Sequence, residues 1–201
     1  MKHARDNWMW VVVLAITTVA LAYPPSVGIV GQSRNCLSCH VSNGPWKDDA
    51  QTIVDIVDAT TGESLRQTDG RFLIEVERGR TRTVITQIGR KANDDVPPPL
   101  RNAWLYLDPT QLETGSLSKF APGWNVNLPM ACRIVGDEAP GYPGAAITAL
   151  PMTVRPGDSA RSADLELQVM LTSGESAKGN PNAWLKSNYV VRSVQLRVVD
   201  P

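Results

Sequence analysis

Apolar and polar residues alternate with a period of two along several stretches of the chain, and this pattern constrains the fold more than any other feature. Residues 72–77, 81–88, 164–171 and 190–199 all show it. A period of two places successive side chains on opposite faces of an extended strand. Beyond residues 1–22, no stretch of the sequence sustains the 3.6-residue period of a helix. The sequence therefore predicts a mainly β protein.

Turn residues separate these stretches in the way that packed sheets require. Thr61-Gly62-Glu63 and Thr68-Asp69-Gly70 supply turn chemistry between two strand candidates. From Asp55 to Gly89, the spacing of Thr-Gly-Glu, Asp-Gly-Arg-Phe and Gly resembles the transthyretin-like and carboxypeptidase-regulatory β-sandwich repeats. That resemblance implies a β-sandwich and brings no catalytic residues. We expect a β-sandwich-like body over residues 51–201.

Two segments interrupt the strand pattern. Pro97-Pro98-Pro99 is a stiff connector, and the body is either one sandwich or two small domains divided near 97–99. A short strand candidate ends just before Pro109. From Pro109 to Pro151 turn residues are dense. A loop of this length inside a compact domain is usually functional or mobile. We therefore expect a long loop there.

The start of the chain has the features of an export leader. Lys2 and Arg5 precede an apolar run from Trp8 to Ala22, which ends in Ala-Leu-Ala. A basic start, a short apolar centre and small residues at the end predict a signal peptide over residues 1–22. The alternative is an uncleaved anchor, but the strongly apolar part is shorter than the roughly 20 residues of a spanning helix. Cleavage would give a periplasmic or other extracytoplasmic protein.

A short motif follows the leader. Cys36 and Cys39 are separated by two residues, and His40 comes directly after them. Two thiols at this spacing can form thioethers to the two vinyl groups of one porphyrin, and the next residue brings an imidazole under the iron. The pattern predicts one covalently attached haem c in a segment over residues 23–50. Cys36 and Cys39 would be its anchors, and His40 the proximal iron ligand.

Zinc and thiol redox chemistry are the other common uses of a Cys-x-x-Cys pair. Structural zinc usually takes four protein ligands, whereas the chain without its leader offers only these two thiols, the adjacent His40 and the distant Cys132. A thioredoxin-like pair closes a strand and opens a helix, but proline and glycine residues flank this one. The motif resembles that of monohaem c-type cytochromes, and export agrees because c-type haem is attached outside the cytoplasm.

The sixth iron ligand stays open among four alternatives. Methionine is the commonest second ligand of electron-transfer haems and raises the reduction potential. Met130 and Met152 lie in the loop-rich region, whereas Met170 lies on the polar face of a predicted strand and is less attractive. A Cys132 thiolate is the second alternative. For each of these side chains, an ordinary buried role is the competing interpretation.

The third alternative is the α-amino group of Tyr23, which leader cleavage would expose. The order of Tyr23-Pro24, the haem motif and a β-rich body is similar to cytochrome f, and Val41 to Pro45 matches its haem segment in kind. In that family the α-amine of an N-terminal tyrosine binds the iron, and the resemblance implies this role for Tyr23. An α-amine, with a reference pKa of about 7.7–8.0, loses its proton easily enough to bind a metal. The fourth alternative is an open site.

Together these features predict an exported monohaem c-type cytochrome that carries single electrons, free or as the haem subunit of a redox complex, and not an enzyme. The formal net charge is zero. Zero charge argues against nucleic acid as the main partner and suits a redox partner protein approached without long-range steering. A haem with an open sixth site that binds a gas or peroxide is the alternative function. Membrane association would require an uncleaved leader or a membrane-bound complex.

Overall fold

The computed structural model describes residues 35–38, 40–91, 94–111, 120–127, 130–174 and 186–200. Within these ranges the chain forms β-strands and two single turns of 3-10 helix, and the prediction of a mainly β protein is confirmed. In chain order the elements are η2 (Cys36–Ser38), β1 (Thr52–Asp58), β2 (Phe72–Glu77), β3 (Arg82–Arg90), β4 (Arg101–Leu107), η3 (Pro109–Gln111), β5 (Trp124–Val126), β6 (Met130–Ile134), β7 (Ala146–Pro156), β8 (Ala163–Thr172) and β9 (Ser187–Val199).

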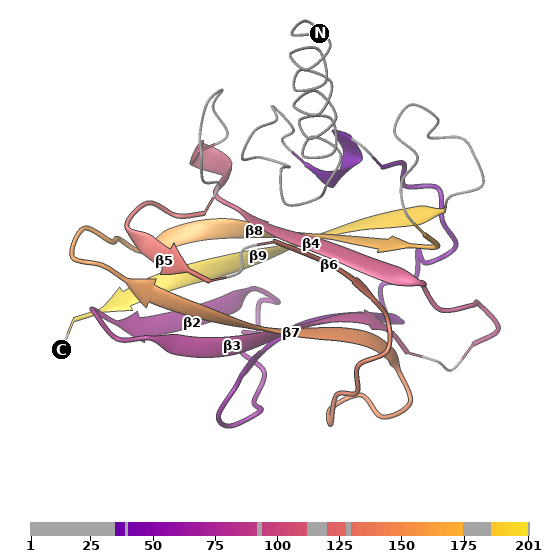
Figure 1. Cartoon of the computed structure of the whole chain (residues 1–201), viewed down its shortest axis with the longest axis horizontal. Helices are drawn as coiled ribbons and strands as arrows, with labels where there is room; N and C mark the ends of the chain where they lie inside the picture. Colours follow the sequence, from indigo (N-terminus) through magenta and orange to yellow (C-terminus); the bar gives the residue numbers. More distant parts are fainter. Residues whose placement is uncertain are drawn as a thin grey trace, which may run out of the picture.

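The strands form two sheets that pack face to face (Figure 1). One sheet has the order β1-β3-β7-β5, and the other has the order β2-β9-β8-β4-β6. Neighbouring strands are antiparallel except for β2 and β9, which run parallel. Strands that precede and follow Pro97–Pro99 occur in both sheets. The predicted β-sandwich-like body is confirmed.

The space between the sheets is filled by apolar side chains at every second position of the strands, as the period of two in the sequence predicts. On β8 these are Leu165, Leu167, Val169 and Leu171, all buried in one cluster. They meet residues from both sheets, including Phe72, Ile74, Val84, Ile88, Trp104, Tyr106, Met152, Val154, Val194 and Leu196. Burial of a large apolar side chain contributes roughly 1.5–3 kcal/mol. This cluster is the main stabilising feature of the fold.

The expectation of a long loop from Pro109 to Pro151 is wrong for much of that segment. β5, β6 and the first half of β7 lie within it. Pro151 argues against a strand because proline lacks an N–H. However, the N–H groups of Ala149 and Thr153 donate to Asp137 and Asn127 on the side of β7 away from β3. Pro151 occupies the same alternate position, so it removes no bond from the β3–β7 ladder.

Close approach of β3 and β7 at Gly89 yields a stability prediction. A Cβ atom on Gly89 would lie 2.1 Å from the backbone oxygen of Ala146. We expect Gly89→Ala to lower the free energy of unfolding by about 1–3 kcal/mol, because the two strands must move apart. Gly141→Ala is the matched control, since its Cβ would meet nothing within 4 Å. Urea unfolding measures both, and equal midpoints for the two variants would contradict the prediction.

Candidate functional site

The haem motif lies against one sheet of the sandwich. In Figure 1 the turn η2 is the indigo ribbon beside β8 and β4, on the side away from β3 and β7. We call this side of the five-stranded sheet the outer face. Within the turn, the His40 N–H donates to the Cys36 oxygen over 3.0 Å. Because this bond joins residues four apart, it closes one helical turn and places the Cys36 and His40 side chains on neighbouring positions. Cys39 lies outside the described residues.

A side chain of the sheet holds the start of this turn. The Cys36 N–H donates to the Oε1 atom of Gln168 over 3.1 Å. Gln168 is only 2 % exposed, and its Nε2 group donates to Glu166 over 3.1 Å. A hydrogen bond in a buried setting contributes about 1 kcal/mol net, and its loss leaves an unsatisfied group. Gln168 therefore orients the motif on β8.

The residues that follow the motif pair with the first residues of β9. Ser42 forms a parallel bridge with Ser187, and the Gly44 N–H donates to the Ser187 oxygen over 2.7 Å. Asn188 continues the contact, because its Oδ1 atom accepts the Trp46 N–H over 2.8 Å. A Cβ on Gly44 would lie 2.5 Å from that same Oδ1 atom. This exit segment, residues 41–46, is thus fitted closely to the sheet.

Trp46 links the exit segment to a second part of the chain. Its indole Nε1 donates to the Pro97 oxygen over 2.7 Å, and the ring is 3 % exposed within the main core cluster. A buried indole that finds an acceptor for its N–H packs without a desolvation penalty. The segment after the motif is therefore anchored in the core as well as paired along β9.

The outer face beneath the motif is apolar and buried at its centre. Met170 and Leu107 are 0 % exposed and Leu105 is 6 % exposed, yet none of them belongs to the core cluster between the sheets. In the strand register, Met170 on β8 has Ala103 of β4 as its neighbour on one side and Tyr189 of β9 on the other. Directly opposed residues share a face. The outer face therefore carries a second apolar layer.

The pKa values of two ionisable groups, His40 and Tyr189, are shifted by the surroundings of the motif. Burial lowers the pKa of His40, which favours the neutral form of the imidazole. Neutral imidazole is the form that binds metals. Burial also raises the pKa of Tyr189 to about 12, and the charges of Cys36 and Glu166 add to this effect. Cys36 and Tyr189 are therefore close enough for their charges to interact.

The candidate sixth ligands have different positions. Met152 is 1 % exposed in the core cluster and pairs with Val84, so it faces the inside of the sandwich. Cys132 is half-buried on β6, where it pairs with Ala103. The backbone of Met130 also lies on β6, opposite Leu105, while its side chain is outside the described part of the chain. Tyr23 lies outside the described residues.

Sequence reasoning missed the residues of the sheet that hold the motif. Gln168 appeared only as one polar residue of an alternating strand, and Ser187 to Tyr189 precede the start of the last predicted strand. Their role depends on contacts with residues more than 130 positions away. The one available signal in the sequence was a methionine, Met170, on the nominally polar face of that strand. Period-two patterns do not tell whether such a face is covered.

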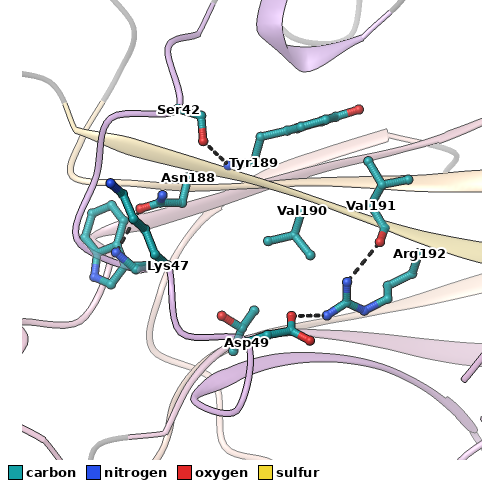
Figure 2. A pocket seen from close by; sticks show the side chains of 10 residues that line it. Ser42, Lys47, Asp49, Asn188, Tyr189, Val190, Val191 and Arg192 are labelled. Atoms are coloured by element: carbon teal, nitrogen blue, oxygen red, sulfur yellow. Dashed lines mark hydrogen bonds and ion pairs between the residues drawn. The ribbon is translucent and has the colours of Figure 1, made fainter.

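A hollow of about 390 Å³ lies beside β9 and is lined by residues of the exit segment (Figure 2). Its charged groups include Lys47 and an ion pair between Asp49 and Arg192. Figure 2 shows Tyr189 on one side of β9 and Val190 on the other. The described lining contains no histidine, cysteine or methionine. The hollow therefore holds none of the predicted ligands.

Within the described ranges, no three histidine, cysteine, aspartate or glutamate side chains cluster as a metal site. A haem does not need such a cluster, because its porphyrin supplies four of the iron ligands and the protein adds one or two. In the same part of the chain, no helix has the length and apolarity needed to cross a membrane. Comparison of the sequence with protein-family models and with curated proteins finds no match.

The contact between Cys36 and Gln168 leads to a prediction. Gln168→Leu removes the acceptor of the Cys36 N–H. We expect the amides of residues 36–46 to exchange with solvent about fivefold faster, as a loss of about 1 kcal/mol implies. Gln195→Leu, on the same face of neighbouring β9, is the control. Hydrogen-exchange mass spectrometry on the two variants measures the difference, and unchanged exchange in Gln168→Leu would show that this bond does not hold the motif.

Proposed function

We propose that this chain is an exported monohaem c-type cytochrome that carries single electrons, free or as the haem subunit of a redox complex. The observation that carries the proposal is the position of Cys36 and His40 in one hydrogen-bonded turn, docked on a buried apolar face of a β-sheet. In the sequence, Cys39 completes the set of two thiols and one imidazole that haem c requires. When bound, the haem supplies an iron that alternates between the ferrous and ferric states.

The donor set and its surroundings fit this cofactor. Desolvation lowers the pKa of His40 and so favours the neutral imidazole, which has a lone pair to donate to iron. Leu105, Leu107 and Met170, on the same face of the sheet as Gln168, are all buried from water. The hydrogen bond of Gln168 to the Cys36 backbone fixes the start of the turn.

The motif also has an exposed side that suits a redox partner. Leu37 is 42 % exposed and Val41 is 36 % exposed, and both flank the ligand residues. Two apolar side chains at the rim of a cofactor support a small contact that forms and separates quickly, as weak electron-transfer encounters do. The absence of net charge on the chain agrees with this kind of docking. We therefore expect the partner to approach over η2.

Covalent attachment is tested by expressing the full chain, with its leader, in cells that attach haem c. We expect the purified wild type to keep one haem through denaturing electrophoresis, since thioether bonds survive unfolding. Cys36→Ala leaves at most one thioether and should yield little stable holoprotein. Cys132→Ala is the control, and we expect it to keep the wild-type haem content. Mass spectrometry and the alkaline pyridine spectrum measure attachment, and normal holoprotein from Cys36→Ala would refute the assignment.

The ligation state separates electron transfer from the alternative function, an open haem that binds a gas or peroxide. We expect the reduced protein to show a sharp low-spin α-band, because both axial positions of the iron are filled. We also expect carbon monoxide to bind slowly, since it must displace a protein ligand. A high-spin ferrous spectrum with immediate carbon monoxide binding would contradict the carrier role and favour the open site.

A further inference from the structure

Met170 occupies an unusual place for a methionine. It lies on β8, 0 % exposed, on the outer face of the five-stranded sheet and outside the core cluster between the sheets. Val169 and Leu171, its neighbours along the strand, point the other way and belong to that core cluster. The Met170 thioether is therefore buried without taking part in the main core.

Met170 is close to the site where the motif docks. Gln168, which accepts the Cys36 N–H, is two residues away on the same face of β8. Two residues along a strand span about 7 Å. Tyr189 lies directly opposite Met170 on β9. Met170 is thus the next residue on the same face of β8 after the one that holds the motif.

The Met170 side chain is of a kind that can turn toward a cofactor. Ala103 lies directly opposite it on β4. Methionine is unbranched and has three rotatable bonds, so its sulfur can adopt several directions from one backbone position. A thioether is also a soft ligand of the kind that binds haem iron in electron-transfer proteins.

The other sulfur-bearing residues are less well placed. Met152 faces the core between the sheets. Met130 and Cys132 lie on β6, which is separated from β8 by β4. Two strand spacings amount to about 10 Å, whereas the Cys36 contact is on β8 itself. The register therefore favours Met170 over the other three side chains.

We propose that the thioether sulfur of Met170 is the sixth ligand of the haem iron. This inference rests on the proposed function, because it presupposes haem attached at Cys36 and Cys39 with His40 as the proximal ligand. It corrects the expectation that Met170 is unattractive because it lies on a polar face. The face is polar in sequence but buried in the structure. Thioether ligation favours the ferrous state and so raises the reduction potential.

The first test compares Met170→Leu with Met130→Leu and Met152→Leu in the full-length holoprotein. Leucine keeps the volume of methionine, so a buried site tolerates it best. We expect Met170→Leu to keep its covalent haem but to lose the near-infrared methionine-to-iron band of the ferric form. It should also become high-spin and bind carbon monoxide rapidly in the ferrous form. Both controls should keep the wild-type spectrum. Retention of the band in Met170→Leu would overturn the inference.

A second test needs no Met170 variant and therefore does not depend on its folding. After leader cleavage three methionines remain, Met130, Met152 and Met170. In ferrous protein labelled at the methionine methyl carbon, the methyl group of an iron ligand is shifted far upfield by the porphyrin ring current. The signals of Met130 and Met152 are identified by their loss in the two control variants. We expect the shifted signal to persist in both, which assigns it to Met170.

The outcomes separate this inference from the proposed function. Wild-type protein without covalent haem would refute both. Covalent haem with the shifted methyl signal absent, or removed by Met130→Leu, would overturn the role of Met170 and leave the cytochrome assignment standing. Covalent haem with the shifted signal assigned to Met170 would support both.

Discussion

Strand β8 is buried on both of its faces, and the rest of the structure depends on this double burial. From Leu167 to Thr172 every residue is buried. Strands of an antiparallel sheet commonly pack one face on a core and leave the other to solvent. Here one face forms the centre of the sandwich, while the other receives the turn that carries the ligand motif. The fold and the candidate site thus share one strand as their common support.

The contact between the motif and β8 is fixed in one orientation by a buried polar side chain, Gln168. Burial of a side-chain amide without a hydrogen-bond partner costs about 1–3 kcal/mol of folding free energy. The buried Gln168 side chain therefore favours the arrangement in which its hydrogen bonds are made. The Cys36 N–H and Glu166 meet this requirement. An apolar contact alone would hold the turn against the sheet in several similar positions. The glutamine selects one of them, and the haem that we propose would need its ligands to be held with that precision.

Much of the sandwich was predictable from the period of two. The expected strands at 72–77, 164–171 and 190–199 correspond to β2, β8 and β9, and their apolar positions are the ones that fill the core. Local alternation and turn residues depend only on nearby sequence, so one chain suffices to recognise them. The first half of β7 was missed because turn residues are dense from Pro109 to Pro151, which predicted a long loop. Pro151 is tolerated in the strand because it lies on the side of β7 away from β3, where the neighbouring N–H groups of Ala149 and Thr153 donate to side chains.

The sequence alone predicts a role for Cys36, Cys39 and His40, because their spacing is a local pattern, but it does not predict the surface that holds Cys36. Alternation along β8 shows that Gln168 and Met170 share a face. It does not show that another part of the chain covers that face. Whether this face of β8 is covered depends on the tertiary structure, that is, on which strands pair and on where the segment after the motif is fixed. Polar neighbours in the sequence therefore made Met170 look solvent-exposed.

Pairing of the exit segment with β9 has a consequence for the order in which the molecule assembles. Ser42, Asn43 and Trp46 are held by residues 142 to 147 positions later in the chain, on a strand that is synthesised after all the others described. Until that strand is synthesised, these contacts cannot hold the exit segment against the sheet. Two parts of the described structure that are far apart in the sequence, the exit segment and the start of β9, therefore become ordered together, late in assembly.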